Sequence, residues 1–146
     1  MKRFFAIAGL SIASVLVIAN ADQGKDYKWS LSRSLQMDLD RNGQTDSAQL
    51  RIGPDQVGLL IKLNKKPLPV IEIPIDGSKQ FGICPGSRPE ISVVPQSEAP
   101  LNALGETPEG YKTCPTCVEI VIDGGECDSL QFYWNSVTKK VAWWRA

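Results

Sequence analysis

The chain has 146 residues, with 16 basic and 16 acidic side chains and no histidine. The balanced charge, with basic residues scattered along the chain, gives no reason to expect nucleic acid or an anionic membrane as a partner. The absence of histidine excludes imidazole-based serine or cysteine catalysis and histidine-ligated zinc sites, so proton transfer would need carboxylates, lysine or tyrosine. We therefore expect a protein that is not an enzyme.

The first 21 residues have the layout of a secretory signal peptide. Met1-Lys2-Arg3 is a short positive region, residues 4–19 form an apolar run, and Ala19-Asn20-Ala21 is a cleavage site of the A-x-A kind. The apolar run is shorter than the roughly 20 residues that span a bilayer, and no cysteine directly follows it for lipid attachment. We expect signal cleavage, no stable membrane anchor, and one all-β domain of residues 22–146 in the periplasm or outside the cell.

Alternating apolar and polar residues predict β-strands in the first half of the chain. Residues 27–39 alternate with period two, with Arg33 as the exception on the apolar face. Residues 48–52 continue the alternation after a polar loop, so the two strands should form an antiparallel hairpin. Further strands are expected at residues 57–63, 70–75 and 80–84. The strand at residues 70–75 should lie at a sheet edge because Pro74 lacks an N–H.

The second half begins with a long proline-rich segment. Six prolines occur from Pro85 to Pro115, around one short apolar stretch at residues 91–94, and so long a loop is usually functional or mobile. Three further strands are expected after it. No amphipathic helix and no internal repeat is evident. We therefore predict an all-β protein, an antiparallel meander of about eight strands that forms a small sandwich or open barrel, with the last three strands at residues 118–122, 130–134 and 140–144.

The segment from Asp38 to Asp46 reads D-x-D-x-N-G-x-x-D and is the most specific motif in the chain. Oxygen ligands at positions 1, 3, 5 and 9, with glycine at position 6, form the first part of a calcium-binding loop. Three crowded aspartates also repel one another unless a cation compensates them. The alternative is that Asn42-Gly43 is only a two-residue hairpin turn, which would pair Met37 with Ala48 and Leu35 with Leu50.

An EF-hand is disfavoured because Gln49 stands at the twelfth position, where glutamate is expected, and because strands flank the loop. The loop instead resembles the D-x-D-x-[DN]-G-x-x-D calcium loops of FG-GAP and VCBS-type β proteins, which lie between strands. The resemblance covers nine residues. Magnesium is disfavoured because all-protein cages with many oxygens suit the larger ion. The resemblance implies that calcium is bound by the side chains of Asp38, Asp40, Asn42 and Asp46 and by the carbonyl of Gln44.

Four cysteines in a small exported domain predict two disulfides, with three possible connectivities. A hairpin that places Cys127 opposite Ile122 puts it about 16 Å along the strand from Cys117, beyond the reach of a disulfide. We therefore expect the pairs Cys84–Cys127 and Cys114–Cys117. A four-thiolate zinc site is disfavoured by the oxidising compartment, and a redox role for the second pair is disfavoured because a strand follows it.

Aromatic residues occupy both faces of the last predicted hairpin, because neighbours on a strand point in opposite directions. One face must pack on the core, and the other is either covered by the proline-rich segment or exposed as a binding surface. The end of the chain, from Gly125 to Asn135 and then Trp143-Trp144-Arg145, resembles that of small bacterial envelope proteins. The candidates for partner binding are Tyr133, Trp134, Trp143 and Trp144.

These features permit two main hypotheses. The first is a periplasmic binding or inhibitor protein, for example an immunity protein that blocks an envelope-targeted toxin, with a protein as its partner. The second is a calcium-dependent glycan or peptidoglycan-binding module that uses its tryptophans as stacking platforms. A carboxylate hydrolase using Glu119, Glu126 or Asp128 is less favoured, because a solvated strand face explains the same residues.

Overall fold

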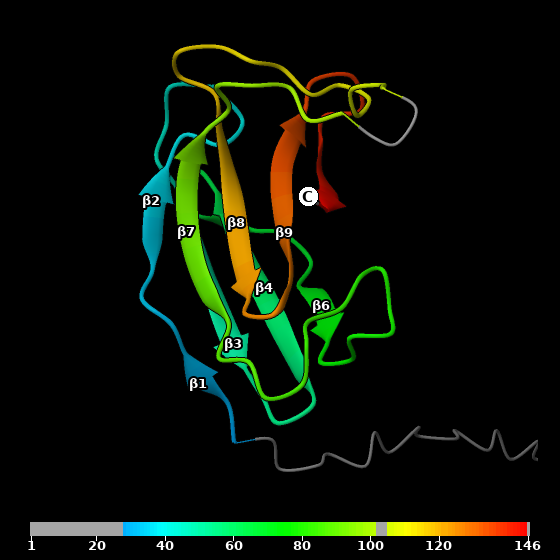
Figure 1. Ribbon diagram of the computed structural model, residues 1–146. Helices are drawn as coiled ribbons and strands as arrows, with labels where there is room; N and C mark the ends of the chain where they lie inside the picture. The colour runs from blue at the N-terminus through cyan, green and yellow to red at the C-terminus, as the bar shows by residue number, and fades with distance from the viewer. Residues whose placement is uncertain (1–27, 102–104, 146) are drawn as a thin grey trace, which may run out of the picture.

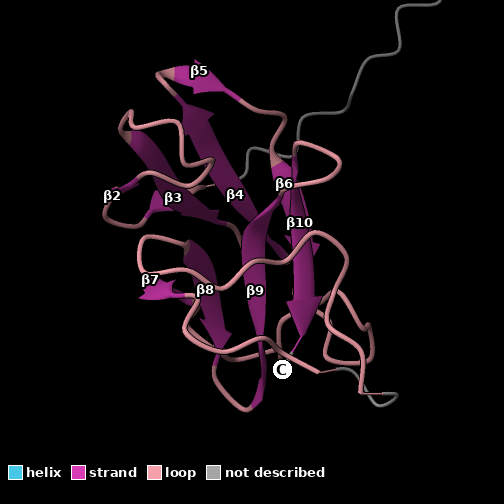
Figure 2. Cartoon of the chain, turned by 90° about the horizontal axis from the view of Figure 1, so that it is seen from above, coloured by secondary structure: helices cyan, strands magenta, loops and turns pink. Residues whose placement is uncertain are grey.

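The computed structural model describes residues 28–101 and 105–145, so the signal peptide predicted at residues 1–21 lies outside the described part. All regular structure in the described part is β-strand, arranged in two antiparallel sheets that face each other as a small open sandwich (Figures 1 and 2). The all-β prediction is therefore confirmed. None of the described residues belongs to a helix that could span a membrane.

The first sheet is built around a long hairpin. Its two central strands, β3 and β4, pair from Ser47 with Lys62 to Ile52 with Val57. β1 and β2 both pair with the outer side of β3, and β5 and β6 pair with β4. The strands are β1 (Ser30–Leu31), β2 (Leu35–Met37), β3 (Asp46–Ile52), β4 (Gln56–Leu63), β5 (Lys66–Pro67) and β6 (Ile71–Pro74).

The second sheet is a four-stranded meander with the strand order β10-β9-β8-β7. Each strand pairs with its neighbour in the sequence, which accounts for the short turns predicted between the last three strands. Figure 1 shows β7, β8 and β9 in front of β3 and β4. The strands are β7 (Glu90–Pro95), β8 (Val118–Gly124), β9 (Cys127–Asn135) and β10 (Lys140–Arg145).

The core lies between the sheets. Alternate side chains of both sheets point inward and are removed from solvent, and each such aliphatic or aromatic side chain contributes roughly 1.5 to 3 kcal/mol by burial. This interior holds the sandwich together without a helix. The central residues, all 1 % exposed or less, are Leu50, Val57, Leu59 and Ile73 of the first sheet and Ile120, Ile122, Leu130 and Phe132 of the second.

The single long strand predicted at residues 27–39 is wrong, because a bulge divides it. Leu31 pairs with Arg51, and Leu35 pairs with Ala48. Between these two pairs the chain advances four residues from β1 to β2 but only three residues along β3. One extra residue is therefore accommodated between β1 and β2, as in a β-bulge, and the alternation reverses across it. As a result, Leu31 is 65 % exposed and Arg33 is exposed, so no charge enters the core there.

Two other strand predictions need correction. Residues 80–84 form no strand, although Ile83 is buried and its N–H donates to the carbonyl of Pro74. The apolar stretch predicted inside the proline-rich loop is instead part of β7, which pairs along its whole length with β8. The position of β6 agrees with the edge strand predicted from Pro74, since β6 pairs only with β4 among the described residues.

Both predicted disulfides are present, and all four cysteines are used in them. Their geometry differs from the expected hairpin, because Cys127 lies opposite Gly124 and not opposite Ile122, with an irregular register between these two residues of β8. The four cysteines therefore form no zinc site in this state. Two structural disulfides indicate an oxidising, exported location.

Candidate metal centre

The loop that joins β2 to β3 is wide. Met37 pairs with Asp46 and Leu35 pairs with Ala48, so residues 38–45 lie outside the ladder. The register predicted for a two-residue turn at Asn42-Gly43 is therefore wrong. Gly43 adopts a φ of 82°, in the left-handed region that glycine enters without strain, and lets the loop reverse its direction.

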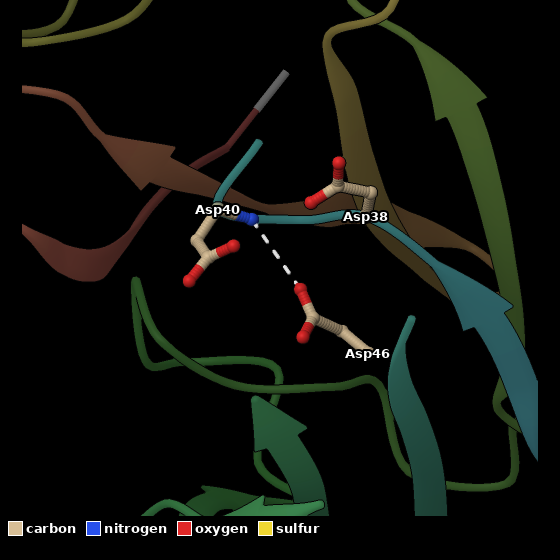
Figure 3. Close-up of side chains that lie close together, drawn as sticks. All are labelled: Asp38, Asp40 and Asp46. Carbon is tan, nitrogen blue, oxygen red and sulfur yellow. Dashed lines mark hydrogen bonds between the residues drawn. The ribbon is translucent and has the colours of Figure 1, made fainter. Parts of the chain in front are cut away.

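This loop brings three carboxylates together. Asp38, Asp40 and Asp46 each offer a carboxylate oxygen, and these oxygens lie within 4.8 Å of one another (Figure 3). Asp46 stands at the first position of β3 and is 1 % exposed, whereas Asp38 and Asp40 are half-buried. The spacing in the sequence therefore translates into a compact oxygen cluster at one end of the first sheet.

Asp46 is fixed by backbone N–H groups from two loops. Its Oδ2 accepts the N–H of Leu39 at 2.8 Å and that of Asp40 at 3.4 Å, the second of which Figure 3 draws. Its Oδ1 accepts the N–H of Asn64 at 2.9 Å, from the turn between β4 and β5. Asp46 thus ties the candidate centre to a neighbouring turn of the same sheet.

The other side chains are held by the loop itself. Asp38 accepts the N–H groups of Asn42 and Gly43 at 3.0 and 2.9 Å. Asp40 accepts from the backbone N–H and the side-chain amide of Asn42, whose own oxygen accepts the N–H of Gln44. A carboxylate has about four lone-pair positions, so these bonds orient the oxygens and still leave lone pairs for a cation.

The negative charge of the cluster is not balanced by protein cations. Within residues 28–101 and 105–145, no lysine or arginine forms an ion pair with any of the three aspartates. Burial, followed by the neighbouring charge of Asp46, raises the pKa of Asp40, while hydrogen bonding from Asn42 lowers it. Carboxylates that repel one another in this way provide a site that a cation would stabilise.

The two non-aspartate ligands predicted from the motif lie at the exposed side of the loop. Asn42 and Gln44 are both exposed, and Gln44 lines a shallow depression of about 280 Å³ beside Asp38 and Gly43. The structure thus brings the three predicted aspartates together in a cluster that could hold a metal ion. It places Asn42 against Asp40 through its side-chain amide.

Two contributors to this region were not predicted. Asn64 acts through its backbone N–H, and no side-chain pattern marks such a role. Arg41, inside the loop, donates from Nη1 to the Sγ of Cys117 at 3.3 Å and so links the loop to the second disulfide. This contact joins segments that are far apart in the sequence, so spacing alone could not reveal it.

Comparison with known proteins gave no match to a family model, to a curated protein or to a solved structure.

The C-terminal aromatic residues differ in how far they are covered, and Tyr133 is the one packed against the proline-rich segment. Tyr133 is 2 % exposed, donates its hydroxyl to the carbonyl of Glu109, and packs edge-on against Tyr111. Trp134 and Trp144 are half-buried. Trp143 is 38 % exposed and lies against Phe81, with 4.6 Å between the ring centroids. Of the four candidates, Trp143 therefore presents the most accessible ring.

Of the three acidic residues considered for hydrolysis, Glu119 lies apart from the other two. Glu119 is 7 % exposed and accepts hydrogen bonds from the hydroxyl of Tyr111 and the indole N–H of Trp144. Glu126 and Asp128 are exposed near the β8–β9 turn, about five residues along β8, or roughly 16 Å, from Glu119. Burial raises the pKa of Glu119, which fits a carboxyl group that anchors a loop.

Proposed function

We propose that this protein is an exported calcium-binding β protein that acts by binding a partner in the bacterial envelope. The observation that supports it most directly is the convergence of Asp38, Asp40 and Asp46, whose carboxylate oxygens lie within 4.8 Å of one another and form no ion pair with a lysine or arginine of the described residues. Calcium suits this set because it accepts many oxygen ligands in flexible geometry. Asn42 and the carbonyl of Gln44 complete the proposed ligand set.

The proposed role of calcium is to brace one end of the first sheet. Asp46 already joins the β2–β3 loop to the turn at Asn64, and a cation on the three carboxylates would hold that connection against their mutual repulsion. Outside the cytoplasm, a dissociation constant of about 10⁻⁴ to 10⁻³ M is sufficient for such a site. The signal peptide expected from the sequence and the two disulfides support the periplasm or the extracellular space as its location.

The proposed partner is a protein, and the proposed activity is binding or inhibition, as in an immunity protein that blocks an envelope-targeted toxin. A rigid sandwich with two disulfides and a metal brace supports this proposal, because preorganised surfaces lose little conformational entropy on binding. Glu119 lies roughly 16 Å along β8 from Glu126 and Asp128 and is held by Tyr111 and Trp144, which favours a binding protein over a carboxylate hydrolase.

A calcium-dependent glycan module is the second candidate. The exposed ring of Trp143 favours it, since an aromatic face can stack on a sugar. The hypothesis is weakened because Tyr133 is buried and the indole of Trp144 is hydrogen-bonded to Glu119, so Trp143 is the most exposed of the four candidate residues. Retention on peptidoglycan or polysaccharide that a chelator abolishes, and that Trp143→Ala removes, would favour this candidate.

Titration calorimetry tests the metal site. The oxidised protein should bind one calcium ion, and the double variant Asp38→Asn/Asp40→Asn should bind none. Asp128→Asn is the matched control, because Asp128 is an exposed carboxylate far from the loop and should leave binding unchanged. Equal calcium affinity in the double variant and the wild type would remove the basis of the proposal.

Immobilised oxidised protein, loaded with calcium, tests the partner. We expect it to retain one defined protein from an envelope extract, and the purified partner should then bind in solution with one-to-one stoichiometry. No retained protein, or retention equal to that of an unrelated disulfide-bonded domain, would contradict the binding role. This outcome would leave the calcium site itself intact.

A further inference from the structure

We infer that the groove between β1 and β7 is the surface that receives the partner, and that it fits an extended peptide segment carrying acidic side chains. This inference rests on the proposed binding function, and it specifies the binding surface and the chemical class of the ligand. The groove encloses about 560 Å³, within the range of roughly 300 to 1,000 Å³ typical of ligand sites.

The groove lies where the two sheets part at their open edge. Residues 30–33 line one side and residues 88–91 the other, together with Ile52. β1 is an end strand of the first sheet and β7 is an end strand of the second, and Figure 1 shows both on the same side of the sandwich. A segment that enters the groove can therefore contact both sheets.

The groove has two arginine side chains without a partner among the described residues. Arg33 and Arg88 are exposed, and neither side chain forms a hydrogen bond or ion pair within the part of the chain that the structure describes, although the carbonyl of Arg33 accepts the hydroxyl of Ser32. The other arginines of that part are all engaged, as Arg51 pairs with Glu72, Arg41 donates to Cys117 and Arg145 donates to the carbonyl of Gly82. The unpaired guanidinium groups are thus concentrated at this groove.

Arginine favours carboxylate partners because its planar guanidinium can donate two parallel hydrogen bonds to one carboxylate. Glu90 is the one acidic residue lining the groove, and its single negative charge faces the two positive charges of Arg33 and Arg88. The groove therefore has an excess of positive charge in a protein whose total charge is zero. Charge complementarity selects an acidic ligand.

The groove also offers unpaired strand edges. The N–H of Ser32 donates to Leu50 and the N–H of Gln96 donates to Cys117, which fixes the hydrogen-bonded pairs of both end strands. Because such pairs alternate along an antiparallel ladder, the backbone groups of Leu31 and Ile91 point away from their own sheets. Outward-pointing backbone groups of an end strand can pair with an added extended chain, and Leu31 is the accessible one of the two, because it is 65 % exposed whereas Ile91 is 5 % exposed.

The exposed side chain of Leu31 adds an apolar contact at the same place. It is 65 % exposed, whereas the other leucines of the first sheet face the core or are half-buried. A free phosphate or a small carboxylate could use the arginines but not Leu31 or the backbone edges. An extended acidic peptide uses all three, so we assign the groove to a peptide segment of a partner protein.

Titration with a synthetic peptide of alternating aspartate and valine, capped at both ends, tests this assignment. The calcium-loaded, oxidised protein should bind it with a dissociation constant below about 1 mM, with the largest amide shift at Leu31 by nuclear magnetic resonance. Arg33→Glu/Arg88→Glu should weaken binding by at least about tenfold, because like charges would then face each other. Arg33→Gln/Arg88→Gln should give an intermediate loss of affinity. It provides a second test of the arginines if the charge-reversed variant Arg33→Glu/Arg88→Glu does not fold.

The control variant is Lys62→Glu/Lys112→Glu, which changes the total charge equally at two exposed positions outside the groove and should bind normally. Unchanged affinity in Arg33→Glu/Arg88→Glu, no binding in the wild type, or equal affinity for a lysine–valine peptide would overturn the assignment. Binding of citrate or phosphate as tight as that of the peptide would overturn it as well. Should the wild type still bind calcium and its envelope partner, only the groove assignment fails, and the proposed function stands.

Discussion

Asp46 has two roles, because its carboxylate belongs both to the fold and to the candidate metal centre. It is 1 % exposed and accepts N–H groups from Leu39, Asp40 and Asn64. Asp38 is half-buried and accepts N–H groups only from within the loop. The two aspartates should therefore respond differently to substitution.

We predict that Asp46→Ala lowers the free energy of unfolding by about 2 to 4 kcal/mol even without calcium, because buried N–H groups lose their acceptor. Asp38→Asn should change it by less than about 1 kcal/mol without calcium and should abolish the stabilisation that calcium adds. Urea denaturation with chelator and with calcium measures both effects. Equal losses for the two variants in chelator would contradict this division of roles.

Glu119 gives a pH-dependent prediction. Burial raises its pKa above the ordinary value of 4.5, and the hydrogen bonds from Trp144 and Tyr111 oppose that rise only in part. A raised pKa in the folded state means that the protonated carboxyl group is favoured by folding. Its contribution is fully present below the unfolded pKa and is lost as the pH rises through the folded pKa.

Glu119→Gln should therefore be more stable than the wild type at neutral pH, by about 1 kcal/mol, since a buried charge is removed and an acceptor is kept. The difference should shrink as the pH falls towards 4.5. Urea denaturation at several pH values measures it, with Glu126→Gln as the exposed control. A difference that does not change with pH would show that ionisation of Glu119 does not limit stability.

At the scale of elements, the bulge between β1 and β2 determines which side chains face the groove. The Ser32 side chain takes the place of a backbone acceptor in the ladder, because its Oγ accepts the N–H of Leu50 at 2.9 Å. Leu50 is fully buried, so this N–H has no access to water. We predict that Ser32→Ala lowers the free energy of unfolding by about 1 to 2 kcal/mol, whereas Ser34→Ala, at an exposed position, changes it by less than about 0.5 kcal/mol.

Chemical denaturation of the two serine variants measures this difference. A cost at Ser34 as large as that at Ser32 would mean that the bulge is not held by the Ser32 hydroxyl. The amide of Leu50 should also exchange faster with solvent in Ser32→Ala, because its acceptor is lost.

The alternation of side chains predicted most of the strands, because it records which face of a strand is buried. It could not reveal the bulge, since one extra residue reverses the alternation and Ser32-Arg33-Ser34 carries no signal for it. It also missed the extent of β7, which prolines bracket. Pro95 is tolerated there because it lies in an end strand, where its missing N–H costs no ladder bond.

The candidate site was predictable to the extent that it is local. The spacing of Asp38, Asp40 and Asp46 within one loop was sufficient to predict that they converge. The N–H of Asn64, the contact of Arg41 with Cys117 and the groove between β1 and β7 depend on the pairing of distant segments. Such contacts follow from the tertiary structure and leave no periodic trace in the sequence.

At the scale of the whole molecule, the two disulfides constrain the chain very differently. Cys84–Cys127 spans a separation of 43 residues and joins the connection between the sheets to the start of β9. Cys114–Cys117 spans a separation of 3 residues. In the chain-entropy description, the long loop contributes about 4 kcal/mol and the short one about 2 kcal/mol.

We therefore predict that Cys84→Ser/Cys127→Ser loses about 4 kcal/mol of unfolding free energy and Cys114→Ser/Cys117→Ser about 2 kcal/mol. Guanidinium denaturation of each double variant measures the two losses. A larger loss for the short pair would show that local packing around Cys117, including its contact with Arg41, outweighs loop entropy.

The most direct test of the central claim measures the unfolding free energy of the oxidised protein as a function of calcium concentration. A single calcium site in the folded state predicts a rise of about 1.4 kcal/mol for each tenfold increase in calcium above the dissociation constant. The rise should be absent in Asp38→Asn/Asp40→Asn. An unfolding free energy that stays constant from chelator to millimolar calcium would contradict the claim that Asp38, Asp40 and Asp46 form a calcium site.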